Sequence, residues 1–376
     1  MYFRINLNRC NIILDRDFYY SSFLNLLMLF DFRICYYLFS FKKFYTSMNI
    51  EKKYNLYKKQ VDKKINFFLD ERFPASLYQP VKYIMESGGK RIRPIILLFS
   101  CEAVGGNYKN ALNAAAAVEI LHNFTLIHDD IMDNALKRRG RDTVHNKWDV
   151  NTAILSGDGL IGYAYKFLLN TKSGRIVEII RHFNSAIIEV CEGQSYDKEY
   201  EIKTDVSIDE YILMIKKKTS KLIEISCVIG GLIGNADEKQ IRILKNYSSN
   251  IGIAFQILDD LLDIDSDEKL FGKKTGGDII ERKKTYLAVK ALEVVKNGKE
   301  RKLLNSVFVN KSVKIVTPDI IEQIKVIYQK NGVLDLARKE IRKYTDIAEY
   351  NLAKLTNENG VEMLKWFSQM LLSRNY

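Results

Sequence analysis

The chain has 376 residues, of which 47% are hydrophobic and only four are proline, and it carries a formal net charge of +12 at pH 7. This length and apolar content are sufficient for a large globular core. The charge excess favours a lysine-rich solvated surface; the alternative is that the cations concentrate around an anionic substrate. No basic stripe alternates with aromatic residues as in a nucleic-acid-binding module, so we expect no nucleic-acid partner.

Residues 1–47 differ from the rest of the chain, being rich in Phe, Tyr, Leu and Ile and free of glycine and proline. Their apolar segment at 18–30 is interrupted by Asn25 and is shorter than the about 20 residues of a spanning helix, so we expect no stable membrane insertion. The pattern of a signal or transit peptide is incomplete. We interpret 1–47 as an extension outside the fold, with translation beginning at Met48; a targeting segment is the alternative.

Residues 48–376 show apolar residues at helical spacing and no internal repeat or low-complexity linker. This pattern predicts an all-α fold in a single domain of about ten or more helices. The cysteines have no C-x-x-C spacing and are odd in number, which favours reduced, buried thiols in a cytoplasmic protein. They are Cys10, Cys35, Cys101, Cys191 and Cys227.

The first segment with chemical potential is GGKRIRP at 88–94. Its two glycines permit a tight turn, and Pro94 suits the first turn of a following helix. Three cations crowd this junction, and a helix N-terminus binds anions through its free N–H groups. We predict a diphosphate pocket formed with Lys90 and Arg93; a solvated basic turn is the alternative.

An acidic motif, DDIMD at 129–133, ends the apolar helical stretch 114–127. Asp129 and Asp133 share a helix face, where like charges cost roughly 0.2–0.5 kcal/mol per pair, so folding alone does not explain them. His122 lies two turns upstream on the same face, either as a core residue or as part of a site. Arg138 and Arg139 follow the motif and could bind phosphate, balance the aspartates, or do both.

The motif recurs as DDLLD at 259–263, after the apolar stretch 251–258. Oxygen-only clusters suit Mg²⁺, which binds through one or two carboxylates plus substrate phosphates. The two clusters therefore predict a polyphosphate held between two acidic walls. Three weaker signals are Lys218 with Thr219 at the start of a buried segment, Gln256 on an apolar stretch, and a glycine-hinged loop at 271–278 that could close over a phosphate.

Together these segments resemble the trans-isoprenyl diphosphate synthases, or polyprenyl synthetases. The resemblance covers most of 48–300 and is carried by GGKRIRP at 88–94, LHNFTLIHDDIMDNALKRRG at 121–140, AILSGD at 153–158, KKTSKL at 217–222 and AFQILDDLLDIDSDEKLFGKKTGGDI at 254–279. One departure is visible. The family usually has Thr-x-Pro after the closing loop, where this chain has Thr285-Tyr286-Leu287, which puts a local bend in doubt.

The resemblance implies an isoprenoid synthase fold with helices around a deep apolar cavity, usually in a homodimer. It also implies three Mg²⁺ ions, for which Mn²⁺ could substitute, gripping the diphosphate of an allylic substrate. They would be held by Asp129, Asp133 and Asp259, with Asp130, Asp260 and Asp263 in support. The allylic C–O bond ionises, the double bond of isopentenyl diphosphate attacks the cation, and a proton is lost, with no protein nucleophile.

The family's further functional positions carry over to residues of this chain. Lys90, Arg93, His122 and Arg139 are expected to bind isopentenyl diphosphate. Arg138, Lys218 and Lys273 are expected to hold the allylic diphosphate, which could be dimethylallyl, geranyl or farnesyl. Thr219 and Gln256 are expected to lie near the developing cation.

Product length is expected to depend on Phe124 and Thr125, which lie about one turn upstream of Asp129 and would face the tail of the growing chain. A bulky Phe124 predicts a short product of C15–C20; alternatively Phe124 turns into the core and a different residue sets the floor. The same motifs would also suit a long-chain synthase or a non-catalytic partner subunit of such an enzyme. A terpene cyclase is disfavoured because the second acidic motif and the 88–94 segment are both intact.

Overall fold

The computed structural model describes residues 3–7, 10–14, 47–66, 73–265 and 276–373. The chain divides into two compact units, Met1–Lys53 and Tyr54–Tyr376. In the first unit, β1 (Phe3–Leu7) pairs antiparallel with β2 (Cys10–Leu14), with Phe3 opposite Leu14, and residues 47–53 are helical. This hairpin is not predicted from the sequence.

The second unit is built from helices, which confirms the predicted all-α fold. Residues 54–66 are helical. The helices that follow are α2 (Ala75–Met85), α3 (Ile92–Ala103), α4 (Tyr108–Met132), α5 (Val144–Lys147), α6 (Val150–Leu169), α7 (Ile176–Ile202), α8 (Ile208–Ile215), α9 (Lys221–Ile233) and α10 (Glu238–Asp265). After them come α12 (Gly277–Ile280), α13 (Tyr286–Val294), α14 (Gly298–Leu304), α15 (Pro318–Lys330), α16 (Val333–Leu352) and α17 (Glu358–Ser373). The two-residue strands β3 (Lys137–Arg138) and β4 (Arg141–Asp142) form a small hairpin after α4.

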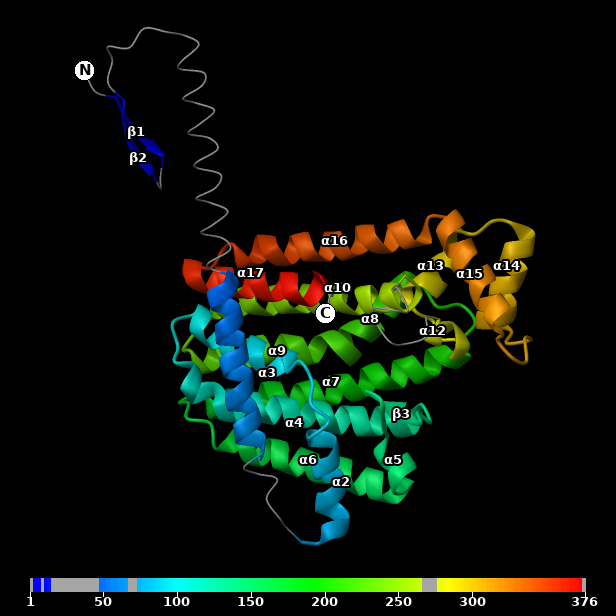
Figure 1. The fold of residues 1–376 in the computed structure, drawn as a ribbon, viewed down its shortest axis with the longest axis horizontal. Helices are drawn as coiled ribbons and strands as arrows, with labels where there is room; N and C mark the ends of the chain where they lie inside the picture. The colour runs from blue at the N-terminus through cyan, green and yellow to red at the C-terminus, as the bar shows by residue number, and fades with distance from the viewer. Residues whose placement is uncertain (1–2, 8–9, 15–46, 67–72, 266–275, 374–376) are drawn as a thin grey trace. The chain divides into compact units, whose positions relative to one another are not determined.

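The axes of the long helices α16, α10, α7 and α4 are roughly aligned across the second unit, with α16 running opposite to the other three (Figure 1). The main packing partners are α4 with α6, α10 with α16, and α3 with α9. Helix α9 is buried from Leu222 to Ile233 and mostly apolar apart from Glu224 and Ser226, which is the pattern of a helix enclosed by others. Each fully buried leucine or isoleucine stabilises the fold by roughly 1.5–3 kcal/mol, so α3 and α9 form a rigid base for the helices around them.

Side-chain caps define where several of these helices begin. Asn107 accepts a hydrogen bond from the Lys109 backbone at the start of α4, and Asp149 accepts one from the Thr152 backbone at the start of α6. Ser207 begins α8 with a full capping box, in which the Glu210 side chain accepts a bond from the Ser207 backbone. These caps satisfy backbone N–H groups that the helix leaves unpaired, and each contributes about 1 kcal/mol.

Both acidic motifs lie at helix C-termini. Asp133 is the C-cap of α4, and Asp259 and Asp263 lie in the last two turns of α10. The carbonyl groups exposed at a helix C-terminus disfavour negative charge by about 0.3–1 kcal/mol. The fold therefore places acidic side chains where local helix energetics oppose them, which supports a binding function over a structural one.

Two further predictions can be compared with the structure. No helix in the described part of the chain is long and apolar enough to cross a membrane. Cys101 and Cys227 are buried and free, as predicted, but Cys191 is exposed. The prediction that every cysteine is buried is thus wrong for Cys191, because it lies on the outward side of α7 beside the buried Val190.

Candidate active site

The first acidic cluster (Asp129, Asp130 and Asp133) ends α4. The buried Asp130 accepts a hydrogen bond of 2.7 Å at Oδ1 from Nε of Arg138, on the strand that follows. By contrast, no hydrogen bond or ion pair within the described residues holds the Asp129 carboxylate, and burial raises its pKa. Asp130 is therefore bonded to Arg138, whereas the Asp129 carboxylate can bind a cation.

Asp133 is held by two ammonium groups. Nζ of Lys198 on α7 lies 2.6 Å from its Oδ1, and Nζ of Lys283 lies 3.6 Å from its Oδ2. Burial alone would raise the pKa of Asp133, but the hydrogen bond from Lys198 and the charge of Lys283 bring it below its ordinary value. Asp133 is therefore an ionised carboxylate already neutralised by lysines.

The second acidic cluster (Asp259, Asp260 and Asp263) repeats this arrangement. Asp260 is buried and accepts three hydrogen bonds, from the Tyr211 hydroxyl at 2.5 Å, the Tyr286 backbone N–H at 2.8 Å and Nε2 of Gln256 at 3.0 Å. Burial raises the pKa of Asp260 to about 6 although these bonds oppose the shift. In both motifs the middle aspartate is thus fixed by protein donors.

Asp263 anchors the segment after α10. Its Oδ2 accepts a hydrogen bond of 3.1 Å from the Asp278 backbone N–H. Its backbone carbonyl accepts a hydrogen bond of 2.7 Å from the Gly276 backbone N–H. Burial and the charges of Asp260 and Asp263 raise the pKa of Asp278 well above its ordinary value. A fourth carboxyl group therefore adjoins the second motif.

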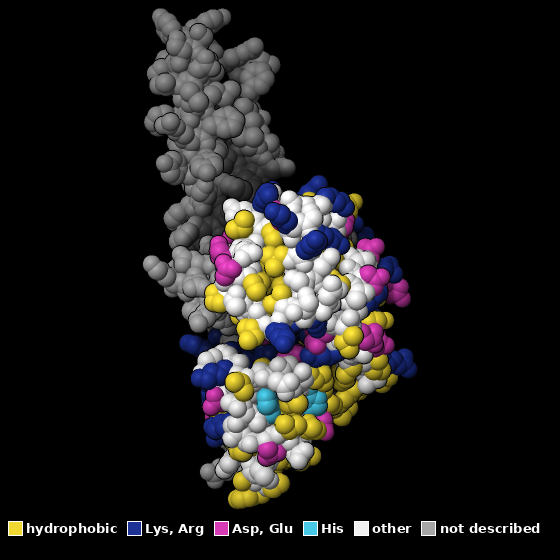
Figure 2. Space-filling model, turned by 90° about the vertical axis from the view of Figure 1, so that its right-hand side faces the viewer, with side chains coloured by type: hydrophobic (Ala, Val, Ile, Leu, Met, Phe, Trp, Pro, Cys, Tyr) yellow, Lys and Arg dark blue, Asp and Glu magenta, His cyan; other side chains and the backbone are white. Residues whose placement is uncertain are grey.

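The two clusters face the same groove. Burial opposes ionisation of Lys283, but its hydrogen bond to Glu281 and the charges of Asp133 and Asp278 raise its pKa. Lys283 thus lies between the end of α4 and the segment anchored on α10. Viewed from the side where these helices end, basic and acidic side chains gather along a groove (Figure 2).

A wide turn positions the predicted Lys218 and Thr219. Residues Lys216–Ser220 form a π-helix between α8 and α9, an irregularity often found at functional sites. This turn packs tightly on α7, since a Cβ added at Gly193 would lie 2.3 Å from the Lys218 backbone nitrogen. Nζ of Lys218 then reaches Oδ2 of Asp197 at 2.5 Å.

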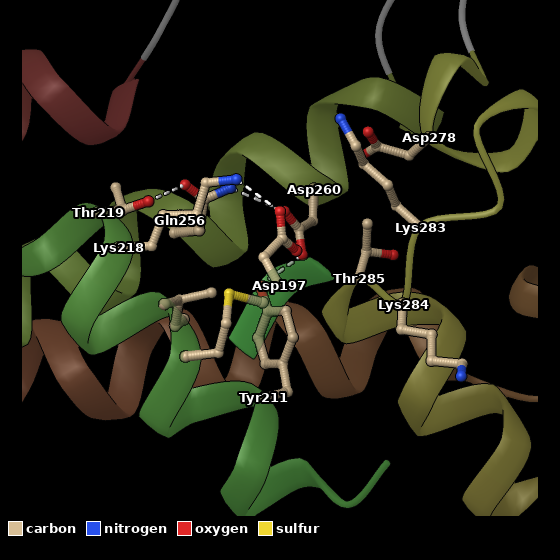
Figure 3. A pocket seen from close by; sticks show the side chains of 12 residues that line it. Asp197, Tyr211, Lys218, Thr219, Gln256, Asp260, Asp278, Lys283, Lys284 and Thr285 are labelled. Atoms are coloured by element: carbon tan, nitrogen blue, oxygen red, sulfur yellow. Dashed lines mark hydrogen bonds and ion pairs between the residues drawn. The ribbon is translucent and has the colours of Figure 1, made fainter. Parts of the chain in front are cut away.

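The π-turn, α10 and the segment before α13 enclose a cavity of about 130 Å³ (Figure 3). On its wall the Thr219 hydroxyl donates to Oε1 of Gln256 at 2.9 Å, and Gln256 donates to Asp260. The structure therefore brings Lys218, Thr219 and Gln256 together at one cavity. The lining residues are Asp197, Tyr211, Met214, Ile215, Lys218, Thr219, Gln256, Asp260, Asp278, Lys283, Lys284 and Thr285.

A second group of cations surrounds His122. NH1 of Arg93 lies 3.1 Å from Nε2 of His122, and Arg139 bonds to the Gly88 carbonyl and to the Ser87 hydroxyl at 3.3 Å. Burial, then the charges of Arg93 and Arg139, lower the pKa of His122 well below its ordinary value. Burial and the charge of Arg139 lower the pKa of Arg93 to about 10, while Glu119 and Asp259 oppose that shift.

The basic turn at 88–94 does not present all its cations outward. Arg91 is buried and pairs at 2.8 Å with Asp62 and with Glu119 of α4. Its left-handed backbone, with φ of 53°, turns its side chain inward. Lys90 is exposed. Lys273 and residues 271–275 of the predicted closing loop lie outside the described residues.

The two residues predicted to set chain length lie about one turn before Asp129 in α4. Phe124 is buried and packs edge-on against the ring of His128, with centroids 4.6 Å apart. The Thr125 hydroxyl donates to the backbone carbonyl of His122 at 2.8 Å. Both side chains are therefore held by their own helix.

Comparisons with known proteins agree with this geometry. A family model described as polyprenyl synthetase matches residues 74–324. The geranylgeranyl diphosphate synthase of Saccharolobus solfataricus is 38% identical over 330 residues, which cover 85% of this chain and 98% of that protein. The crystal structure of geranylgeranyl pyrophosphate synthetase from Pyrococcus horikoshii Ot3 matches with a TM-score of 0.80 at 34% identity, covering 88% of this chain and 98% of that one.

The chain belongs to the polyprenyl synthetase family. This polyprenyl synthetase is a prenyltransferase. Geoglobus acetivorans has a further relative, a geranylgeranyl pyrophosphate synthase 37% identical over 320 residues, which cover 85% of this chain and 97% of that protein.

The carboxylates fit the hard, oxygen-binding metal that the family implies. The described residues contain no group of three or more acids, histidines or cysteines that could hold a metal by itself. This agrees with Mg²⁺, which takes one or two carboxylates and completes its shell with substrate phosphates and water. Asp129 suits such an ion, because it is half-buried and no cation of the described residues is bonded to it.

Four residues of this polyprenyl synthetase shape the groove although no sequence motif contains them: Asp197, Lys198, Tyr211 and Lys283. Their partners are distant in the chain; Lys198 lies 65 residues from Asp133, and Tyr211 lies 49 residues from Asp260. Only for Asp197 is there a local signal, a polar residue four positions after the glycine that contacts the π-turn.

Proposed function

We propose that this polyprenyl synthetase condenses isopentenyl diphosphate with an allylic diphosphate and releases inorganic diphosphate. The observation that carries this proposal is the shared groove of the two acidic clusters, with Lys283 between them. Cations stand on two sides of it, Arg93 with Arg139 on one and Lys218 on the other. Two diphosphates can thus be held at once, which is what joining two such substrates requires.

The reaction needs positioning and charge stabilisation more than a nucleophile. The allylic C–O bond breaks and its electron pair leaves with the diphosphate. The double bond of isopentenyl diphosphate supplies the electrons of the new C–C bond, and a proton then passes to the departing diphosphate. We assign Thr219 and Gln256 to the developing cation, because their hydrogen-bonded dipoles line the cavity beside the second cluster.

Prenyl synthases of this family depend on magnesium. We propose three ions held by Asp129, Asp133 and Asp259, with Mn²⁺ able to substitute. Bound metal would supply neutralisation of the negative charge that develops on the leaving diphosphate. We assign Asp130, Asp260 and Asp263 a supporting role, which the protein hydrogen bonds to all three carboxylates favour.

The remaining cations divide between the two substrates. We assign Lys90, Arg93, His122 and Arg139 to isopentenyl diphosphate and Arg138, Lys218 and Lys273 to the allylic diphosphate. The neutral His122 ring can accept a hydrogen bond from Arg93, which holds the guanidinium beside the turn at 88–89. Arg138 uses Nε on Asp130, so its two terminal nitrogens are available to phosphate oxygens.

We propose a short product of C15–C20, with Phe124 and Thr125 near its tail. The position of Phe124 one turn above Asp129 supports this choice, as do relatives named geranylgeranyl diphosphate synthase. A long-chain synthase is the second candidate. It is favoured by the structural likeness to a decaprenyl diphosphate synthase from Rhodobacter capsulatus, with a TM-score of 0.79 at 28% identity. The complete pair of acidic motifs argues against a non-catalytic partner subunit.

We further propose that residues 48–376 form the synthase domain and act as a cytoplasmic homodimer. Apolar side chains exposed on α6 and α7 support self-association, because they would be covered by a second copy. They are Ile154, Leu155, Leu169, Val177 and Ile188. Sedimentation of the purified protein would give the oligomeric state.

The test of the reaction is direct. The purified protein is incubated with radiolabelled isopentenyl diphosphate, Mg²⁺ and each of dimethylallyl, geranyl and farnesyl diphosphate, and the products are sized by chromatography. We expect C15–C20 products that disappear when the metal is chelated. Products much longer than C20 would favour the long-chain synthase, and no product with any starter would favour a non-catalytic subunit.

A further inference from the structure

Lys198 occupies one of the carboxylates assigned to metal. It lies on α7, and its Nζ is 2.6 Å from Oδ1 of Asp133, a shorter approach than the 3.6 Å from Nζ of Lys283 to Oδ2. Both groups are partly buried, with 30% of the Lys198 side chain and 18% of the Asp133 side chain exposed. Solvent screens such a pair less than a surface pair, so the contact is a real competitor for any other cation.

A second carboxylate lies beside Lys198. Oε1 of Glu201, one turn further along α7, is 2.8 Å from the same Nζ. Glu201 belongs to no acidic motif, and its side chain is 34% exposed. An ammonium group that leaves Asp133 therefore keeps an ion pair on its own helix and does not become an isolated charge. This second partner lowers the free energy needed to release Asp133.

We propose that Lys198 is an internal counter-ion that occupies Asp133 in the metal-free protein and sets the concentration of divalent cation at which Asp133 is released. Because Asp133 is taken as a metal ligand, the proposal rests on the proposed function. Lys198 then acts as a positioning residue: it keeps the end of α4 neutral and ordered until a cation replaces it, and it transfers to Glu201 when that happens.

The proposal predicts opposite effects for two substitutions. Lys198→Met removes the nearer of the two ammonium groups on Asp133, so Mg²⁺ should bind more tightly, with a dissociation constant lower by about threefold to tenfold. Glu201→Gln removes the second partner of the ammonium group, so Lys198 should stay on Asp133 and Mg²⁺ should bind more weakly. The double variant should behave as Lys198→Met, because Glu201 acts only through Lys198.

The experiment is a titration of each full-length protein with Mg²⁺ alone, followed by calorimetry and by the rise in thermal midpoint, with no substrate present. Lys203→Met is the matched control, because Lys203 forms a similar pair of 2.5 Å with Glu210 at the end of α7 and does not contact Asp133. Adding Asp133→Asn to Lys198→Met should abolish the gain in affinity.

The outcomes separate this proposal from the proposed function. Equal or weaker Mg²⁺ binding by Lys198→Met would overturn the counter-ion role, and so would a gain that survives Asp133→Asn. Measurable Mg²⁺ binding by Lys198→Met where the native protein shows none would support it fully. The reaction itself is judged independently, since the product assay with all three starters uses the native protein and makes no reference to Lys198.

Discussion

The Tyr211 hydroxyl donates a hydrogen bond of 2.5 Å to Oδ2 of Asp260, joining α8 to the second acidic motif inside the fold. Asp260 is thereby held on the buried side of α10. Its raised pKa of about 6 reflects this burial. The motif thus contains one aspartate whose chief task is to lock the helix end in place.

Replacing Tyr211 with phenylalanine should destabilise the protein by about 1–3 kcal/mol at pH 7.5, because a buried carboxylate loses a donor. The penalty should shrink below pH 6, where Asp260 becomes protonated and depends less on that donor. Urea unfolding followed by circular dichroism at both pH values measures this difference. Tyr165→Phe is the control, since its hydroxyl donates to the exposed Asn184; an equal loss in both variants would contradict the prediction.

Thr219→Val should lower kcat by about tenfold with little change in KM for either substrate. The substitution keeps the side-chain shape but removes the hydroxyl that orients Gln256 through a 2.9 Å bond. Steady-state kinetics separates the two parameters. Thr345→Val serves as the control, because that hydroxyl bonds only to a carbonyl of its own helix, α16; if kcat is unchanged in Thr219→Val, the dipole has no role in the reaction.

Gly193→Ala should displace the π-turn, since the added Cβ would lie 2.3 Å from the Lys218 nitrogen and 2.7 Å from its Cα. We expect a loss of about 1–3 kcal/mol in unfolding free energy together with a large fall in kcat. Gly298→Ala offers a matched control, because no atom lies within 4 Å of its new Cβ. A variant with native stability and native kcat would show that the close contact is unimportant.

The buried His122 predicts how stability depends on pH. Its folded pKa is depressed, so the unfolded state takes up a proton first as the pH falls through about 6.5. The stabilisation present above that value is therefore lost on acidification, by about 1 kcal/mol at pH 5.5. His122→Gln should lose less stability than the native protein between pH 7.5 and 5.5 in denaturant titrations. Parallel curves would show that the pKa of His122 is not depressed in the folded state.

Phe124→Ala should lengthen the product by at least one isoprene unit, because the ring packed on His128 would no longer block the path that we propose for the growing chain. Radiolabelled products sized by chromatography give the answer. Leu126→Ala, another buried position on α4, controls for a general loosening of the helix. Should product length stay unchanged while the control behaves normally, Phe124 does not face the growing chain.

Much of the site could be predicted from local pattern. Helical spacing placed both aspartate motifs correctly at helix ends, and Pro94 does lie in the first turn of α3. Lys218, Thr219 and Gln256 line one cavity, while their roles stay predictions. These predictions succeed because helix periodicity and turn chemistry depend on neighbouring residues.

Several features depend instead on long-range packing. In the sequence, Arg91 is one more basic residue beside Lys90 and Arg93. In the structure its backbone is left-handed, and its side chain pairs with Asp62 and Glu119. Lys198 and Tyr211 stand in ordinary helical segments, and only the approach of α7 and α8 to the acidic helix ends shows what they hold. The exposure of Cys191 likewise depends on which face of α7 the neighbouring helices cover.

The Arg91 anchor has a consequence for how the enzyme tolerates shortening. Its guanidinium pairs with Asp62 and so links helix 54–66 of the second unit to the turn that carries Arg93. A protein trimmed beyond residue 62 would keep every motif of the family and still leave a buried cation short of one counter-charge. We therefore expect such a shortened enzyme to bind isopentenyl diphosphate more weakly. The carboxylate that is lost lies 29 positions before the arginine with which it pairs.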